Sequence, residues 1–544
     1  MARSRHGVGG AAYAHLTQGT RAANIARCAY PFQPWMDFMP RTTGLSRPVF
    51  ALCLTCASPA LGVTAPEVWA EWQAQSATLG QVVTVQDVVP GDGTLILRGF
   101  DSRFDDGTVA TRAQIDEIVM TEAADGSVII DPSDVYTITL SFAPNPGSQR
   151  VNLGINLIAP DLMITVSGDA GARIYEYQAS QITVEDGPLS GGNGQLPVID
   201  LRIGVQDLAG TYQIDTTDLN NIAYSSSSTF GGITGAIDVT PPPGEEGRLK
   251  LAFSLGASTG NGGGRLGNML DLAANPNAIP AGFDLGGAFS YASASVDVTF
   301  QHPTDAFNLF AANDGGTLSG RFSENAMDYR LTTTGSSTYF NGPDLPVPVD
   351  FSVASAEIAF RVPLSAAPEP QPLAARLAYQ DVMISPEIWA LADPAGAFPR
   401  DPITVIADVS GTAQMMADLL SMDPSMMGAP PGELRQLSLN DLRVSIGGAT
   451  LTGDGAATFA PGQGAGPGSG PVPMPVGAVN LRLAGANALM DRLQSAGVFP
   501  IEQIAMARGL LGAFTRPGTA PDTVESTIQF TQGGGITANG VPLQ

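Results

Sequence analysis

The sequence predicts a mainly β protein, a β-rich α+β fold in which antiparallel meander sheets carry a few short helices packed on them. Apolar and polar residues alternate over many short stretches, which indicates strands with one buried face and one solvated face. Glycine-rich sequences typical of turns separate these stretches. The regular alternation of strands and helices that marks a parallel α/β fold does not occur.

The predicted strands follow one another at short intervals along the chain. Turns are expected at residues 125–126, 191–194, 313–316 and 334–336, so that neighbouring strands reverse direction and pair antiparallel. The alternation is clearest in the stretches 138–142, 151–157, 162–166, 199–205, 296–300 and 358–362.

A short helix is predicted just before the first strands. Thr64 is placed to cap this helix, and Glu67 stands three residues later, as in a capping box. Pro66 suits the first helical turn. Trp69 lies on the apolar side of the helix, and we interpret it as a packing anchor rather than as a platform for a ligand.

The N-terminal region has the pattern of a secretory signal. Arg41 and Arg47 precede an apolar run at 49–57, and the small residues Ala60 and Gly62 follow it. The apolar run is shorter than the roughly 20 residues that span a bilayer. We therefore predict a signal peptide at 39–62, an extension at 1–38 that is not native, and a mature periplasmic protein.

Thiol chemistry is not expected in the mature chain. Cys28, Cys53 and Cys56 all lie before the predicted cleavage point, and the C-x-x-C pair falls inside the apolar signal segment. His302 is the only histidine of the mature chain, whereas zinc sites and Ser-His-Asp relays need several such ligands or a positioned base. We predict no catalytic, cofactor-binding or metal-binding residues and no cofactor.

The chain is strongly acidic, with a formal net charge of -25. Removal of the first 62 residues takes away six arginines and one aspartate, and Lys250 is the only lysine. A negative field of this strength repels phosphate backbones, so nucleic acid is not an expected partner. No later stretch has membrane-spanning length, and we expect a soluble protein whose partner is an unknown envelope component or an apolar ligand.

Two β-rich regions are predicted, at 63–365 and 373–544. The proline-rich stretch between Pro363 and Pro372 separates them, because proline removes donors from a strand ladder. Beyond this stretch, Pro386-Glu-Ile-Trp389 resembles Pro66-Glu-Val-Trp69 near the N-terminus. The two tetrapeptides are weak evidence for a duplication, and they could mark two similar helical plugs on the sheet.

The C-terminal region is predicted to contain a hairpin, a loop and a helix pair. The parity of the apolar residues changes at Asn440-Asp441, which predicts a β-bulge. Gly447-Gly448 predicts a tight hairpin, and 461–475 is predicted to be a loop. Asn487 is expected to cap the first helix and Pro500 to open the second. The expected contacts between these helices and the sheet are Leu489, Leu493, Ile504 and Phe514.

Several of these short sequences together resemble a known family. With Pro66-Glu-Val-Trp69 and the signal, the chain resembles the bacterial envelope family catalogued as domain of unknown function 2125. The resemblance covers essentially the whole mature chain, implies an exported protein without an assigned activity, and carries over no functional residues. It rests on Ser385-Pro-Glu-Ile-Trp389, Phe398-Pro-Arg-Asp-Pro402, Leu437-Ser-Leu-Asn-Asp-Leu-Arg-Val444, Gly453-Asp-Gly455 and Gly535-Ile-Thr-Ala-Asn-Gly540.

A fainter likeness connects residues 439–459 with AsmA-like envelope proteins. The shared feature is a strand pair with the turn Leu451-Thr-Gly-Asp-Gly455. The resemblance implies a long curled sheet with an apolar groove and a link to lipid handling.

Two functions remain open from the sequence. Gly262-Gly-Gly-Arg-Leu-Gly267 matches G-x-G-x-x-G, but it stands in an antiparallel context rather than in a βαβ unit, so nucleotide binding is not expected. The first hypothesis is a non-catalytic envelope protein whose sheet offers an apolar or partner-binding surface. The alternative is an acid-pair hydrolase that acts on cell-wall or extracellular glycan. A continuous apolar groove would favour the first hypothesis, and two convergent buried carboxylates would favour the second.

Overall fold

The structure is a computed structural model of the chain. It describes residues 62–544 except 79, 144–147, 193–195, 219–220, 268–278, 420–430, 466–470, 498 and 544. The predicted extension, residues 39–61 of the predicted signal peptide, and Cys28, Cys53 and Cys56 lie outside the described residues.

The described residues form one sheet of 29 strands. The first strands are β1 (Val82–Thr84), β2 (Asp87–Pro90), β3 (Thr94–Asp105), β4 (Val109–Glu122), β5 (Val128–Pro132), β6 (Val135–Phe142), β7 (Val151–Ile158), β8 (Met163–Ser167), β9 (Ala172–Gly191) and β10 (Val198–Asp215). They continue as β11 (Ala223–Phe230), β12 (Gly232–Thr240), β13 (Arg248–Leu255), β14 (Ser258–Arg265), β15 (Asp284–Tyr291), β16 (Ala294–Gln301), β17 (Phe307–Asn313), β18 (Gly315–Ser323), β19 (Ala326–Asn341) and β20 (Val349–Pro363). The last are β21 (Gln371–Ile384), β22 (Ile403–Met415), β23 (Gly432–Ile446), β24 (Ala449–Ala465), β25 (Pro471–Ala484), β26 (Arg516–Pro517), β27 (Thr523–Phe530), β28 (Ile536–Ala538) and β29 (Val541–Pro542).

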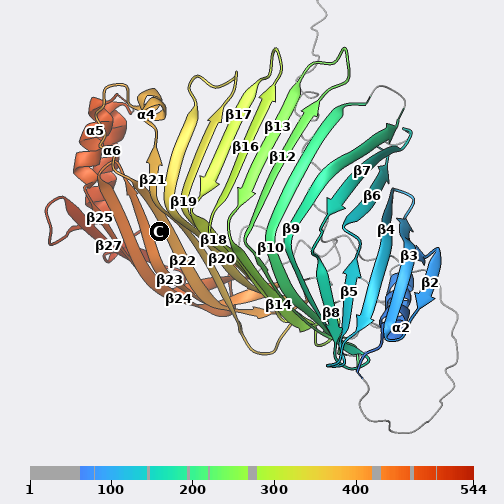
Figure 1. Cartoon of the computed structure of the whole chain (residues 1–544). Helices are drawn as coiled ribbons and strands as arrows, with labels where there is room; N and C mark the ends of the chain where they lie inside the picture. Colours follow the sequence, from blue (N-terminus) through green and yellow to red (C-terminus); the bar gives the residue numbers. More distant parts are fainter. Residues whose placement is uncertain are drawn as a thin grey trace, which may run out of the picture. The chain divides into compact units, whose positions relative to one another are not determined.

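The predicted fold class is confirmed. The paired strands run antiparallel, most of them next to neighbours in sequence. Short helices lie at the two ends of the sheet, and a further one follows the inner strand β21 (Figure 1). These helices are α2 (Ala65–Thr78), α4 (Pro386–Ala392), α5 (Ala486–Ser495) and α6 (Ile501–Phe514). The sheet continues across the proline-rich stretch because β20 pairs directly with β21. The boundary drawn there between two regions stays a prediction.

Two of the predicted turns are wrong. At residues 313–316 the chain does not reverse. β17 and β18 both pair antiparallel with β19, so they run in the same direction and lie end to end along it. Residues 334–336 lie inside β19. β11 and β12 share β10 as partner in the same way. We use "crease" for the line of bends that crosses the sheet where such strands meet end to end, at Asp207, Gly231, Gly256, Asp314 and Gly335.

Local backbone chemistry explains the crease. Asp207 and Gly335 have positive φ angles of 48° and 58°, which interrupt the regular alternation of a strand. A Cβ atom on Gly335 would overlap the carboxylate of Asp314 on the neighbouring row. A Cβ atom on Gly231 would lie 2.5 Å from Oδ2 of Asp207. Glycine therefore lets an aspartate of one strand lie against the backbone of the neighbouring strand. The sheet bends along this line and folds into a trough (Figure 1).

Helix α2 supplies the main hydrophobic core of the described residues. Thr64 N donates to Oε2 of Glu67 over 3.0 Å, which confirms the backbone half of the predicted capping box. Trp69 is 8% exposed, so its packing role is confirmed. The buried cluster comprises Val63, Ala65, Val68, Trp69, Leu95, Leu97, Ile118, Met120, Val128, Ile130 and Val166.

The C-terminal region confirms two predictions and corrects two. The register shifts at Asn440, as expected for a bulge, and the chain reverses at Gly447-Gly448 between β23 and β24. The predicted loop at 461–475 is wrong where described, because β24 and β25 extend and pair, as at Ala460↔Met474. Asn487 does not cap α5. The Asp522 carboxylate instead accepts from the amides of Asn487 and Ala488, both over 3.0 Å.

Candidate functional site

One face of the sheet is apolar over a long series of strands. Residues that are paired across antiparallel strands point to the same face, so cross-strand rows reveal the character of each face. One row on the half of the sheet before the crease is apolar in seven strands, at Leu201, Ile237, Leu251, Val298, Leu309, Phe340 and Val349. The adjacent row on the opposite face is polar, at Asp200, Asp238, Lys250, Thr299, Asn308 and Asn341.

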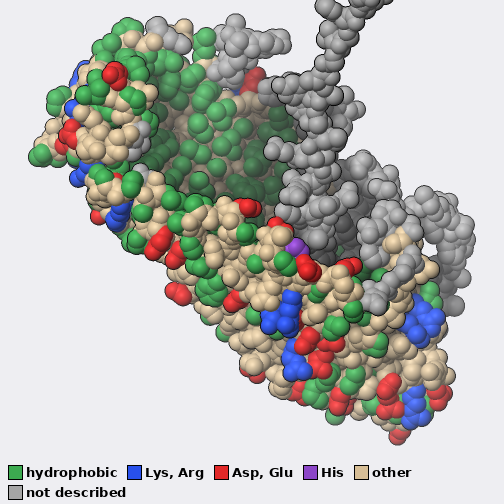
Figure 2. Space-filling model, turned by 90° about the horizontal axis from the view of Figure 1, so that it is seen from above, with side chains coloured by type: hydrophobic (Ala, Val, Ile, Leu, Met, Phe, Trp, Pro, Cys, Tyr) green, Lys and Arg blue, Asp and Glu red, His purple; other side chains and the backbone are tan. Residues whose placement is uncertain are grey.

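A second row, beyond the crease, crosses eighteen strands from β3 to β27. It begins at Leu95 and ends at Ser526, and apolar or small residues occupy it throughout. We call the side of the sheet that carries these two rows the apolar face. Hydrophobic side chains cover the hollowed side of the sheet, and charged side chains lie on the outer side (Figure 2). The second row comprises Leu95, Met120, Ile130, Ile164, Tyr177, Gly210, Ser228, Gly260, Phe289, Leu318, Leu331, Ile358, Leu377, Ala407, Leu442, Gly453, Leu481 and Ser526.

The apolar face is most deeply buried beneath α2. Under α2, Leu95 is 4% exposed and Met120 is 0% exposed. Further along the same row, Leu318 and Leu377 are 39% and 40% exposed. The same kind of side chain on the same face is therefore core at one end and half-open in the middle. The middle of the face has the composition of a core without a second layer among the described residues.

A recess lies in the middle of the apolar face. Three glycines, Gly262, Gly287 and Gly320, are direct cross-strand partners there, with a volume of about 450 Å³ above them. Phe289 and Tyr329 belong to its walls. A Cβ atom on Gly262 or Gly320 would meet nothing closer than 3.5 Å or 3.6 Å. The backbone therefore does not require glycine at these two positions, and its effect is to keep the floor of the trough open.

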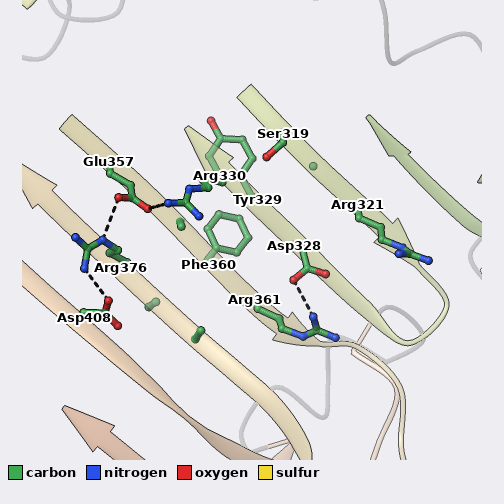
Figure 3. A pocket seen from close by; sticks show the side chains of 14 residues that line it. Ser319, Arg321, Asp328, Tyr329, Arg330, Glu357, Phe360, Arg361, Arg376 and Asp408 are labelled. Atoms are coloured by element: carbon green, nitrogen blue, oxygen red, sulfur yellow. Dashed lines mark hydrogen bonds and ion pairs between the residues drawn. The ribbon is translucent and has the colours of Figure 1, made fainter. Parts of the chain in front are cut away.

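The opposite face carries a ladder of ion pairs. Glu357 forms an ion pair with Arg330 over 2.7 Å and accepts a hydrogen bond from Arg376 over 3.0 Å (Figure 3). Arg376 also binds Asp408 over 2.7 Å. These groups line an open depression of about 770 Å³, which belongs to strands β18 to β22. Alternating charges on adjacent strands stabilise the pairing of the strands, by a few tenths to about 1 kcal/mol per pair.

This ladder does not have the arrangement of a hydrolase acid pair. A general acid needs a raised pKa, which burial without a cationic partner provides. The hydrogen bond from Asn440 and the guanidinium of Arg376 lower the pKa of Asp408 despite its partial burial. The hydrogen bond from Arg103, helped by Arg112, lowers the pKa of Asp101 to about 2. Nothing in this geometry favours the hydrolase alternative.

The glycine-rich motif and His302, which the sequence singled out, contact other parts of the sheet and do not form a nucleotide-binding or metal-binding arrangement. The Gly262–Gly267 motif lies mostly in β14, which pairs antiparallel with β11 and β15, so it does not form a nucleotide-binding turn. The ring of His302 stacks on Phe300, and its Nδ1 lies 3.0 Å from Oγ1 of Thr304. In the part of the chain that the structure describes, no group of three His, Cys, Asp or Glu residues is placed to hold a metal ion.

Two of the sequences that carried the family resemblance, Ser385–Trp389 and Phe398–Pro402, form a single structural unit. Ser385 caps α4, and the guanidinium of Arg400 lies 4.8 Å from the centre of the Trp389 ring. Asp393, 1% exposed, accepts from the amides of Ala397 and Phe398, both over 2.9 Å. These residues therefore hold a loop in place and do not form a binding site.

The sequence analysis offered an apolar sheet surface as a hypothesis but named no residues for it, and the apolar rows and the glycine recess are the candidate features that it did not locate. Alternation did predict many individual strands of the apolar face. Their combination depends on the register between strands distant in sequence, which no local pattern determines.

Comparison with known proteins identifies a family but no activity. The family model described as "Uncharacterized protein conserved in bacteria (DUF2125)" matches residues 272–543. No curated protein matches the chain. A solved structure of the ferric citrate transporter FecA in the unliganded form aligns at 7% identity with a TM-score of 0.15, covering 85% of this chain and 76% of that one. A score this low carries no argument. None of the described helices is long and apolar enough to cross a membrane.

Proposed function

We propose a function for this chain, which belongs to the bacterial family DUF2125: it is an exported, non-catalytic protein that binds the acyl chains of lipids on its apolar face. The observation that carries the proposal is the contrast along one row of that face. Leu95 is a core residue under α2, whereas Leu377 is 40% exposed. Fully burying an exposed leucine is worth about 1.5–3 kcal/mol, so covering the 40% of Leu377 that remains exposed contributes roughly 1 kcal/mol, and a long series of such side chains favours an apolar occupant.

The dimensions of the trough fit extended apolar chains. From β10 to β25 the second row crosses twelve strands, which corresponds to roughly 50 Å at about 4.8 Å per strand. An acyl chain that fills half of a bilayer core about 30 Å thick extends about 15 Å. The trough therefore has room for several chains end to end, with headgroups free to remain in water above the open side.

The cell envelope is the proposed place of action. The basic, apolar and small-residue segments at 39–62 have the order of a secretory signal. We expect the mature protein to begin at Val63 and to be recovered from the periplasm. N-terminal sequencing of the native protein tests this, and a cytoplasmic protein that begins at Met1 would contradict it.

The recess provides a direct test of acyl-chain binding. Two glutamates at its floor, in the double variant Gly262→Glu/Gly320→Glu, should raise the Kd for a fluorescent phospholipid at least about tenfold, because a bound chain would have to desolvate them. The fold has space for a side chain at both positions. Fluorescence titration measures the Kd, and circular dichroism checks that the strands are retained.

The matched control places the same charges on the opposite face. Thr259 and Thr317 lie there, both exposed, and Ser290 separates them as Gly287 separates Gly262 from Gly320. Thr259→Glu/Thr317→Glu should leave the Kd unchanged. Equal Kd values for the two double variants would mean that the apolar face is not the binding surface.

A further inference from the structure

Helix α6 presents apolar side chains to the surface. Ile501, Met506 and Leu510 are 59%, 63% and 54% exposed, and Phe499 just before the helix is 46% exposed. Only Ile504 is buried in this helix. Of the four predicted contact residues, Ile504 is buried, whereas Leu489, Leu493 and Phe514 are half-buried.

This exposure is unusual for a helix of such composition. The charged residues of α6 are Glu502 and Arg508, and apolar or small residues occupy most other positions. A helix that is apolar on all sides is normally enclosed by protein or lipid. Added Cβ atoms on Gly509 and Gly512 would meet nothing within 4 Å, so the outer side of the helix is unoccupied by described residues.

The position of α6 connects it with the trough. The backbone oxygen of Phe514, the last residue of the helix, accepts from Oγ of Ser526 over 2.8 Å. Ser526 is the final member of the long apolar row, as the partner of Leu481. The exposed apolar side of α6 therefore begins where the apolar face of the sheet ends, at the end opposite α2 (Figure 1).

We infer that α6 lies on the surface of a lipid bilayer and that acyl chains enter the trough at this end. The inference rests on the proposed function for the entry role. With 14 residues, α6 is too short to span a bilayer core, which takes about 20 residues. The exposed side chains of Ile501, Met506 and Leu510 on α6, with Phe499 just before it, can be buried at the boundary between headgroups and acyl chains.

Charge favours a bilayer at this end of the protein. The whole chain carries a net charge of -25, which opposes its approach to an anionic lipid surface. The segment 486–517 differs, because its three arginines, Arg492, Arg508 and Arg516, outnumber Asp491 and Glu502. The Asp522 carboxylate, which accepts from the first amides of α5, balances this local charge of +1, so the helix pair with its cap is neutral and can approach anionic headgroups without net repulsion of its own.

Vesicle binding tests the inference. In co-sedimentation with vesicles of phosphatidylethanolamine and phosphatidylglycerol, Met506→Glu/Leu510→Glu should weaken binding of the full chain at least about tenfold, because two apolar side chains are lost from the interface. Both positions are mostly exposed, so the fold should be retained. The control Phe310→Glu/Met383→Glu changes residues that are 42% and 45% exposed on the charged face, and should bind vesicles like the unaltered chain.

The outcomes separate this inference from the proposed function. Titration with the fluorescent phospholipid in vesicle-free solution should give the same Kd for the α6 variant and the unaltered chain. Equal vesicle binding by both double variants would overturn the inference, even if the trough binds lipid. A change from dimer to monomer in the α6 variant would also overturn it, because the occupant would then be a second copy. Vesicle binding by a chain that does not bind the phospholipid probe would instead refute the proposed function.

Discussion

Replacement of Leu95 by alanine should lower the free energy of unfolding by about 2–5 kcal/mol, the range for a buried leucine whose cavity does not collapse. Leu95 is 4% exposed and belongs to the cluster beneath α2, with Trp69 and Met120. The backbone is well paired on both sides of β3 in this region, so relaxation into the cavity should be limited. Urea titration followed by circular dichroism measures the change.

The matched variant is Leu377→Ala, because the same residue type lies in the same cross-strand row but without a covering helix. Since Leu377 is 40% exposed, its loss should cost less than about 1.5 kcal/mol in the absence of ligand. A saturating phospholipid should increase the free-energy cost of Leu377→Ala, because ligand bound to the folded state adds to stability and the variant binds it less well. Equal destabilisation by the two variants without ligand would show that the middle of the face is already a closed core.

Replacement of Gly335 by alanine should also be costly, by about 2–3 kcal/mol. The φ angle of 58° disfavours an L-residue by about 1–2 kcal/mol, and the new methyl group would overlap the carboxylate of Asp314. Thermal unfolding measures the loss. The bend at this point brings the two halves of the row toward each other, so the variant should also weaken phospholipid binding.

A second substitution distinguishes the two causes of that loss. In Gly335→Ala/Asp314→Ala the overlap with the carboxylate is removed while the backbone strain remains, so about half of the stability should return. Gly320→Ala is the control, because Gly320 has ordinary strand geometry and an open Cβ position. A Gly335→Ala protein as stable as the Gly320→Ala protein would mean that the crease does not depend on glycine.

The strands were predictable and the crease was not, for a physical reason. Alternation in stretches such as 199–205 reports that one face avoids water, and the structure has strands there. Asn313-Asp314-Gly315-Gly316 has the composition of a hairpin turn, yet the chain continues in the same direction through it. Glycine with positive φ suits both a reversal and a bend within a row. Only the partner strand β19 decides between them, and that partner is specified by distant residues.

The candidate site was less predictable than the fold. Local alternation shows that Leu377 and Leu95 both lie on the apolar side of a strand, but it contains no information on what covers either of them. Coverage depends on where α2 packs, and α2 ends at Thr78, 16 residues before β3 begins at Thr94. Gly262 of the recess belongs to a stretch that gave a false match to a nucleotide-binding motif, because a Gly-rich stretch is equally suited to an open floor in an antiparallel sheet.

Most strands of the meander contact mainly the strands beside them, so the fold is nearly one-dimensional. The length of the trough is therefore set by the number of strands that lie side by side. Insertion of one hairpin of two strands would lengthen the trough by about 10 Å without requiring a new core, as in repeat proteins whose terminal units act as caps. α2 and the α5–α6 pair occupy the positions of such caps. The number of strands between these two caps would then set the length of trough that is open to acyl chains. Shortened or extended versions of this chain should therefore differ in how many acyl chains each one binds.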